Sequence, residues 1–392
     1  MTSHPHPASR VCLAVAACLA LMTVRPAAAQ QQVPESLKAA IDRIDAMAAA
    51  EHAKDNVGSV TIGVVQGSHL VWTRSYGVAD GEQNIRATKD TIYRIGSITK
   101  QFTAVMLLQL VEDGVVRLSD PVERYFPEVN TLAARPPHAP PITLVQLATM
   151  TAGIAREPAN LPKYLVGPVE HWEEVMVSAL RETKYEYEPG TRYFYSNIGY
   201  AMLGAALARA AKTGYTTHVQ ERVLTPLGMA ETSFEPMPAL ASRVAKGYEI
   251  DRDGRASFDV PQREHEGRGY KVPNGALYTT VGDLARFVAF QVGEGPESVL
   301  KPSTLRDHQS RTLSATGNLM SGYGLGFQIM RRGEYVFHGH SGSVAGYTAQ
   351  ALVHLPSKTG VIVLRNAAGG KFQISDLALN AMSALASAGS GK

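Results

Sequence analysis

The amino-acid sequence predicts a mixed α/β (α+β) fold, in which helices flank one antiparallel β-sheet and a mainly helical subdomain is inserted into it. Two observations lead to this class: a helix followed by a β-hairpin pattern near the start of the chain, and a hairpin followed by a helix near its end. A third is the composition between about residues 106 and 270, which is richer in Pro, Ala and helical patterns.

The first helix is expected over residues 35–51, because apolar residues such as Leu37 and Ile41 recur there at helical spacing. Two β-rich runs follow, residues 57–66 and 69–76. The Gly-Ser pair between these runs is typical of a hairpin turn. The chain therefore begins with a helix and two antiparallel strands.

The end of the chain mirrors this pattern. Residues 346–355 and 361–366 are β-rich, and the polar turn 356–360 separates them. A closing helix is expected over about residues 373–385. We therefore expect the two ends of the chain to build one sheet.

These patterns predict one domain over residues 30–392. Its sheet subdomain would comprise about residues 35–105 and 271–386, and its helical subdomain about residues 106–270.

The first 29 residues have the layout of a secretory signal peptide. Arg10 precedes an apolar stretch over residues 11–24, and small residues end at Ala29. The stretch is too short to span a bilayer. An alternative is lipidation of Cys18, but the residues after this cysteine are apolar, whereas a mature lipoprotein should become polar there. We expect cleavage after Ala29 and export to the periplasm or the medium.

The composition limits which classes of binding partner are expected. The net charge is +3 over 392 residues, and Lys and Arg are scattered rather than clustered, so nucleic acid is not an expected partner. Both cysteines, Cys12 and Cys18, lie in the leader, so the rest of the chain has no disulfide, thiol nucleophile or cysteine metal site. We expect a small-molecule or short-peptide substrate, no cofactor, no metal and no later membrane span. The oligomeric state stays open.

The first chemical motif joins Ser97 and Lys100. They are three residues apart at the start of an apolar helix that begins near Phe102, so both should face the same side. Burial and the positive helix end disfavour an ammonium group, so Lys100 could accept a proton. The alternative is that Ser97 only caps the helix. A second Ser-x-x-Lys match ends at Lys301, where the following proline disfavours helix, and we reject it.

The second motif is Tyr195-Ser196-Asn197. It follows a Glu-Pro-Gly turn and precedes a helix expected over residues 199–211 and closed by Gly214. The alternative is a core tyrosine followed by an asparagine cap.

The third motif is His340-Ser341-Gly342, at the start of a β-run, where small residues could lie beside a substrate. The alternative is a surface-strand histidine. His338 lies on the same strand face, but no third ligand stands at motif spacing, so we do not expect a metal. Lys358-Thr359-Gly360 is a rival for this motif, but it lies in a polar turn and should face solvent.

In this order, the three motifs resemble those of the class C β-lactamase and D,D-peptidase-related serine hydrolases. The likeness covers about residues 35–385 and implies a β-lactamase/transpeptidase-like fold. The segments that carry it are residues 94–102, 188–191, 195–200 and 339–342, with further likeness at 120–122, 277–284 and 323–326.

The resemblance implies a role for each matching residue. Ser97 would be the nucleophile and Lys100 its proton acceptor. Tyr195 would carry the proton to the leaving group and activate the deacylating water. Asn197 would hold the substrate carbonyl or Lys100. The N–H groups of Ser97 and Ser343 would form the oxyanion hole, and His340, Ser341 and Gly342 would flank the substrate.

Two departures from the family pattern stand out. Met150 and Ala152 stand where many relatives carry His and Ser, so local hydrogen bonding should differ. His340 stands where the lactamase branch often has Lys; a partly charged histidine anchors a carboxylate less firmly and would give a pH dependence near its ordinary pKa of about 6.5.

The sequence therefore predicts an exported serine hydrolase acting on amide or ester bonds of D-amino-acid peptides or small esters, with β-lactams as further candidates. The alternatives are a β-lactamase proper and a slowly acylated penicillin- or muropeptide-binding protein. An α/β-hydrolase is excluded, because the chain has no Gly-x-Ser-x-Gly.

Overall fold

The computed structural model describes residues 1–2, 33–263, 267–310, 314–315 and 320–389. Gln32–Lys392 form one compact unit, and the account below concerns that unit alone. The expected signal peptide, its cleavage site after Ala29 and both cysteines lie outside the described residues.

The centre of the unit is a nine-stranded sheet in which every neighbouring pair is antiparallel. The order is β3-β2-β1-β13-β12-β11-β10-β9-β8, so β1 from the first hairpin pairs with β13 from the last. The predicted joining of the two chain ends in one sheet is confirmed. The strands are β1 Ser59–Gln66, β2 His69–Asp80, β3 Ile85–Arg86, β8 Ser314–Ala315, β9 Ser321–Tyr323, β10 Gln328–Arg332, β11 Tyr335–Val344, β12 Tyr347–His354 and β13 Thr359–Arg365.

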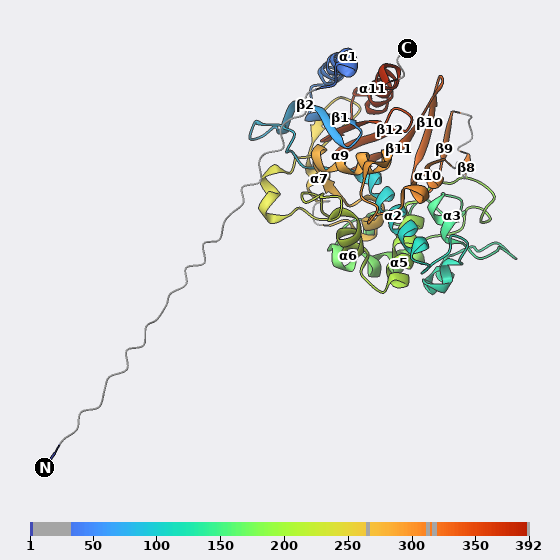
Figure 1. Cartoon of the computed structure of the whole chain (residues 1–392). Helices are drawn as coiled ribbons and strands as arrows, with labels where there is room; N and C mark the ends of the chain where they lie inside the picture. The colour runs from blue at the N-terminus through green and yellow to red at the C-terminus, as the bar shows by residue number, and fades with distance from the viewer. Residues whose placement is uncertain (3–32, 264–266, 311–313, 316–319, 390–392) are drawn as a thin grey trace. The chain divides into compact units, whose positions relative to one another are not determined.

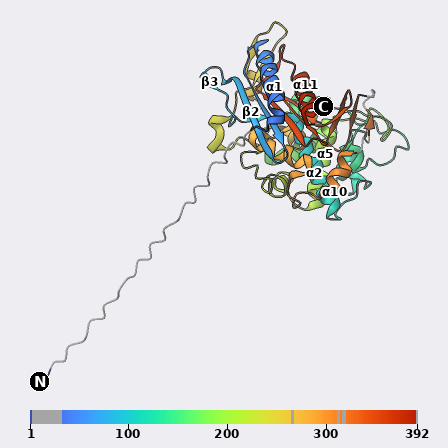
Figure 2. The same cartoon turned by 45° about the horizontal axis from the view of Figure 1, so that its top comes forward.

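Two helices cover one face of the sheet. These are α1 (Glu35–Ala53) and α11 (Ile374–Gly389), which lie side by side although they come from opposite ends of the compact unit (Figures 1 and 2). Leu37 and Ile41 of α1 are buried at the predicted helical spacing, in a cluster that includes inward side chains of β1 and β13. This face is a closed apolar layer.

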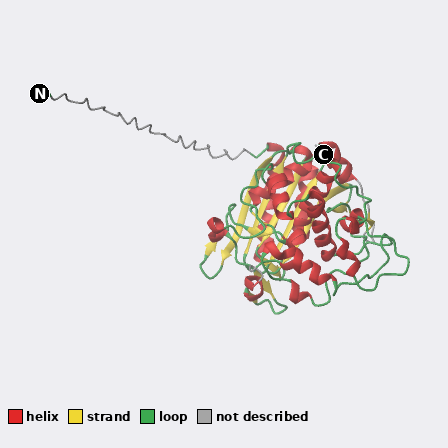
Figure 3. Cartoon of the chain, turned by 90° about the horizontal axis from the view of Figure 1, so that it is seen from below, coloured by secondary structure: helices red, strands yellow, loops and turns green. Residues whose placement is uncertain are grey.

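The other face carries α9 (Val281–Ala289), and beyond it the helices that hold the candidate site. The central helix of this group is α2 (Thr99–Glu112), which is buried from Thr99 to Leu110 and packs against α5 (Asn197–Ala211) and α8 (Val272–Gly275). Seen from below, these helices lie in front of the strands (Figure 3). Because α2 is apolar on all sides, it requires neighbours all around it.

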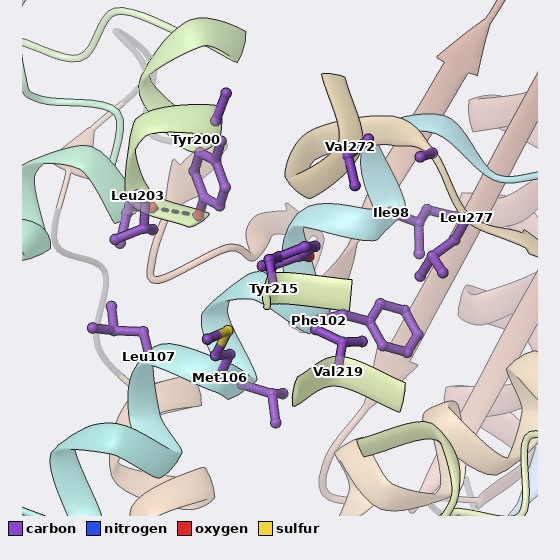
Figure 4. Close-up of a cluster of buried hydrophobic side chains, with 14 of the residues drawn as sticks. Ile98, Phe102, Met106, Leu107, Tyr200, Leu203, Tyr215, Val219, Val272 and Leu277 are labelled. Carbon is purple, nitrogen blue, oxygen red and sulfur yellow. Dashed lines mark hydrogen bonds between the residues drawn. The ribbon is translucent and has the colours of Figure 1, made fainter. Parts of the chain in front are cut away.

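Aromatic and aliphatic side chains lock α2 in place. Phe102 stacks on Phe287 of α9 with ring centroids 4.0 Å apart, while Met106 and Tyr215 extend the same cluster (Figure 4). The start of α2 is therefore held rigidly between sheet and helices.

Shorter elements complete the unit. The small helices are α3 Leu144–Ala148, α4 Trp172–Leu180, α6 Tyr215–Val219, α7 Asp259–Arg263 and α10 Pro302–Ser310. Two small sheets are formed by β4 Tyr93–Arg94 with β7 Tyr278–Thr279, and by β14 Ala367–Gly369, β5 Tyr248–Ile250 and β6 Ala256–Ser257.

One expected helix-closing residue is wrong. Helix α5 ends at Ala211 as expected, but the residue that closes it in the left-handed conformation is Lys212, with φ 55°, rather than Gly214. Its N-cap is the Ser196 side chain, which accepts from the Gly199 N–H. Asn197 is thus not the cap, and its amide is available for other contacts.

Candidate active site

Ser97 lies in a short 3₁₀ turn, Gly96–Ile98, between strand β4 and helix α2. Gly96 makes the turn possible: its φ is +49°, and a Cβ there would come within 2.8 Å of the backbone of Ser343. The N-cap positions of the 3₁₀ turn and of α2 are Ile95 and Ile98, so Ser97 caps neither segment. The reading of Ser97 as a simple helix cap is therefore wrong.

Lys100 is completely buried one turn further along the chain. Its Nζ lies 3.0 Å from Ser97 Oγ, 2.8 Å from Asn197 Oδ1 and 3.0 Å from the carbonyl oxygen of Asn274. All three partners are neutral. Burial, then the positive charge of Lys271, lowers the pKa of Lys100 well below the ordinary lysine value.

The hydrogen bonds around Lys100 give the amine a direction. A neutral amine has two N–H groups and one lone pair. The carbonyl oxygens of Asn197 and Asn274 can only accept, so they take both N–H groups. When Lys100 is neutral, its lone pair therefore faces Ser97 Oγ, which is the arrangement that a base needs beside a hydroxyl group.

Tyr195 is hydrogen-bonded to Ser97, and the centre of its ring lies 5.0 Å from Lys100 Nζ. Burial raises the pKa of Tyr195 above the ordinary tyrosine value, so the phenol keeps its proton at neutral pH. The guanidinium of Arg156 lies 4.9 Å from the centre of the Tyr195 ring. The structure thus brings Ser97, Lys100 and Tyr195 together.

The residues on both sides of Tyr195 are held by Met150, one of the two positions that depart from the family pattern. The Ser196 N–H donates to Met150 Sδ at 3.3 Å, and the Phe194 N–H donates to the Met150 carbonyl at 2.7 Å. Met150 thereby supports the loop that carries Tyr195. The expected difference in local hydrogen bonding is a thioether acceptor.

Strand β11 runs beside Ser97. A Cβ at Gly342 would lie 1.9 Å from the Ile95 carbonyl, so only glycine allows this approach. The Ser341 N–H points away from β12, because it donates to the side chain of Gln328. Amides two residues apart in a strand point to the same side, so the Ser343 N–H is directed toward the turn that holds Ser97.

His340 differs from expectation. Its ring is 1% exposed, and both nitrogens contact protein atoms: Nδ1 lies 2.5 Å from the Ser341 carbonyl and Nε2 lies 3.0 Å from the Tyr323 hydroxyl. A carbonyl only accepts, so Nδ1 carries the hydrogen and Nε2 accepts from Tyr323. Burial lowers the pKa of His340 to about 3. The expected titration near 6.5 is therefore wrong.

The lysines of both rejected motifs lie on the surface, although Thr359, which was also expected to face solvent, is buried at the start of β13. Lys358 is at the tip between β12 and β13 and pairs with Glu294 at 2.6 Å. Ser298 and Lys301 of the second Ser-x-x-Lys match are exposed. Within the described ranges, no three His, Cys, Asp or Glu side chains gather as metal ligands.

The sequence analysis missed a polar cluster next to Lys100. Glu157 accepts from the Asn197 amide at 2.7 Å, from Lys271 at 3.0 Å and from the Tyr270 hydroxyl. The segment that supplies Lys271 also supplies the Asn274 carbonyl. Residues 269–275 read Gly-Tyr-Lys-Val-Pro-Asn-Gly, and this density of polar and turn residues was the only local signal.

None of the helices in the described part of the chain is long and apolar enough to cross a membrane.

Comparison with known proteins gives a consistent result. The sequence profile of the β-lactamase family matches residues 44–384. A β-lactamase-like protein of Homo sapiens is 27% identical over 84% of this chain and 65% of its own length. The D-alanyl-D-alanine-carboxypeptidase/endopeptidase AmpH of Escherichia coli K12 is 31% identical over 69% of this chain and 66% of its own length. The chain thus spans about two thirds of these relatives.

Among solved structures, the octameric penicillin-binding protein homologue from Pyrococcus abyssi is similar to this chain. The TM-score is 0.71 at 25% sequence identity, and the match covers 88% of this chain and 77% of the other.

Proposed function

The chain belongs to the β-lactamase family of serine hydrolases, and we propose that it hydrolyses amide or ester bonds of small acyl compounds through an acyl-enzyme on Ser97. The observation that carries this proposal is the buried Lys100 amine, 3.0 Å from Ser97 Oγ, with both N–H groups taken by carbonyl oxygens. A serine hydroxyl is a weak nucleophile without such a base.

Acylation begins with transfer of the Ser97 proton to the Lys100 lone pair while Oγ attacks the substrate carbonyl carbon. The carbonyl oxygen becomes an oxyanion, which the Ser97 and Ser343 N–H groups stabilise. The close approach of Gly96 to the Ser343 backbone supports this pairing of amides. Collapse of the intermediate breaks the bond to the leaving group and forms the ester on Ser97.

Tyr195 gives its proton to the leaving group as that bond breaks, and the proton on Lys100 restores the phenol. The high pKa of Tyr195 supports this role, because the group starts protonated. In deacylation, water attacks the ester and its proton passes to the Lys100 amine. The proton then returns to Ser97 Oγ as the ester bond breaks. Asn197 holds Lys100 throughout, and its amide is a candidate contact for the acyl-side carbonyl.

For the substrate, we favour D-amino-acid peptides or small esters over β-lactams. One support is the name of the Escherichia coli relative, a D-alanyl-D-alanine carboxypeptidase/endopeptidase. The other is His340, which is buried and uncharged where a lysine would offer a positive charge to the carboxylate of a β-lactam. Ser341 and Gly342 would then flank the substrate mainly through their backbone.

The decisive experiment is labelling with a fluorophosphonate probe. Wild-type protein should be labelled rapidly on Ser97, and Ser97→Ala should lose both labelling and turnover while its melting temperature stays unchanged. Ser298→Ala is the matched control, because this exposed serine belongs to the rejected motif, and it should be labelled like wild type. Labelling of Ser97→Ala at the wild-type rate would exclude the nucleophile assignment.

A hydrolysis panel then separates the substrates. D-Ala-D-Ala peptides, nitrocefin and short nitrophenyl esters test peptidase, β-lactamase and esterase activity. Rapid labelling followed by no turnover on any of them would favour a slowly acylated binding protein.

We also propose that the protein is exported and cleaved after Ala29. The support is the positive residue, apolar stretch and small residues of the leader. The mature N-terminus, determined by mass spectrometry on protein expressed in a Gram-negative host, should be Gln30 in the periplasmic fraction. Retention of residues 1–29 in a cytosolic protein would contradict export.

A further inference from the structure

Among the described residues, Glu157 is the carboxylate that binds a hydrogen-bond partner of Lys100. It does not touch Lys100 itself but contacts Asn197, which does. One oxygen, Oε1, accepts from Asn197 Nδ2 at 2.7 Å and from Lys271 Nζ at 3.0 Å. The other oxygen accepts from the Tyr270 hydroxyl. Tyr270 is fully buried and the Glu157 side chain is 19% exposed, so the carboxylate is held on both sides.

The Asn197 amide has two different ends, and Glu157 decides which end faces Lys100. A carboxylate can only accept, so it binds the NH₂ end of Asn197 and leaves the oxygen directed at Lys100. If the amide were reversed, its NH₂ would face Lys100 and the lysine lone pair would turn toward Asn197. Ser97 would then face an N–H rather than a base.

We propose that Glu157 is a positioning residue for acylation: its carboxylate fixes the direction of the Asn197 amide, and through it the direction in which the Lys100 amine faces Ser97. The inference rests on the proposed function, because it concerns the base of the same reaction. It adds a residue from a loop that none of the three motifs includes.

Charge gives this role a second readout. Glu157 favours protonated Lys100, whereas Lys271 opposes it. Removing the negative charge of Glu157 should therefore lower the pKa of Lys100 further and move the acid limb of the reaction to lower pH. The titratable or charged groups that face Lys100 are Lys271, Glu157, Arg156, Arg268, Tyr195, Tyr200 and His340.

The test measures the second-order rate of fluorophosphonate labelling of the full chain against pH, so it needs no known substrate. Glu157→Leu removes the acceptor, and its labelling rate per folded molecule should fall by roughly tenfold or more, because a misdirected base is a geometric fault. Glu157→Gln keeps an acceptor oxygen. It should label within about threefold of wild type on the plateau, with its acid limb displaced to lower pH.

The chain offers a matched control. Glu182 also accepts from a tyrosine, Tyr164, at 2.7 Å, and from the adjacent lysine, Lys163, at 3.2 Å, but it does not contact Asn197. Glu182→Leu and Glu182→Gln should leave the labelling rate per folded molecule and the pH profile unchanged. Melting temperatures of all four variants separate lost stability from lost reactivity.

The outcomes distinguish this inference from the proposed function. If wild-type Ser97 is not labelled, the proposed function fails. If wild type is labelled and folded Glu157→Leu is labelled within threefold of it, the positioning role is wrong. If Glu157→Leu does not fold, an acid limb of Glu157→Gln that coincides with wild type overturns the proposal.

Discussion

Two buried basic side chains, Lys100 and Arg365, differ in how the protein accommodates them. Both are almost completely inaccessible, with exposures of 0% and 1%. Arg365, on the frame of the sheet, places Nη2 2.9 and 3.0 Å from the two oxygens of Asp55. Lys100, beside Ser97, contacts three neutral groups, namely the Ser97 hydroxyl and two carbonyl oxygens.

The difference in partners separates a structural role, that of Arg365, from the proposed chemical role of Lys100. A buried cation is stabilised when a carboxylate lies in direct contact, and Arg365 keeps its proton in that setting. The carboxylate nearest the Lys100 hydrogen-bond chain, Glu157, lies beyond the Asn197 amide. Lys100 is therefore poised to exist as an amine, at the cost of stability, whereas Arg365 contributes to holding the sheet against α11.

The largest expected effect comes from removing the amine of Lys100, the proposed base. Lys100→Met should lower the acylation rate by roughly 10³-fold or more, because the base is lost. Its thermal stability should be unchanged or raised, since a thioether needs no hydrogen-bond partners. Labelling kinetics and calorimetry on the same preparation check both statements. A folded Lys100→Met variant with wild-type rate would remove the basis of the comparison.

Asp55→Ala should have the opposite signature. It leaves Arg365 buried without its carboxylate and removes the acceptor for the Lys371 and Phe372 N–H groups before α11. We expect the free energy of unfolding to fall by about 3–4 kcal/mol. The labelling rate per folded molecule should stay at the wild-type value. Denaturant titration measures the first quantity, and a large loss of reactivity in folded protein would argue against the division.

His308 sharpens the comparison, because its burial favours the neutral form. Burial lowers the pKa of His308 to about 4, below the ordinary value of 6.5 that applies when unfolded. Between these values the unfolded chain binds the proton and the folded chain does not, so stability is lost as pH falls from 6.5 toward 4. The slope is about 1.4 kcal/mol per pH unit for each such group. His308→Gln should flatten the stability–pH curve by that amount in urea titrations.

The smallest effect is expected for an exposed, paired lysine. Lys358 lies at a hairpin tip and pairs with Glu294 in solvent, where such pairs contribute roughly 0–1 kcal/mol. Lys358→Ala should change neither the labelling rate nor its pH dependence. A marked kinetic change would revive Lys358-Thr359-Gly360 as the third motif.

The candidate site residues that the structure brings together were predictable from the sequence because each stands in a short local pattern. Ser97 and Lys100 are one turn apart at the start of α2, and Tyr195 and Asn197 lie at the start of α5. Spacing alone therefore brings the members of each pair close together. The sheet was predictable for the same reason: the hairpins are local, and their joining follows from the alternation of helices and strands. Local patterning carries this much of the fold and the site.

Long-range contacts were beyond that reach. Glu157 and Lys271 are 114 residues apart in the sequence, and no local pattern near either residue predicts the contact between them. The state of His340 likewise depends on Tyr323, which approaches from β9 and completes the burial of the ring. Environment, rather than residue type, sets the charge of such groups.

The pairing of β1 with β13 has a consequence for how the molecule is made. The Ser59 N–H donates to Asn366 across 307 residues, so β1 keeps an open edge until the last hairpin has been synthesised. Contacts of such high sequence separation form late and slow folding, and an open strand edge invites association with other chains. A chain truncated before β13 should therefore accumulate as aggregate rather than as a weakened enzyme.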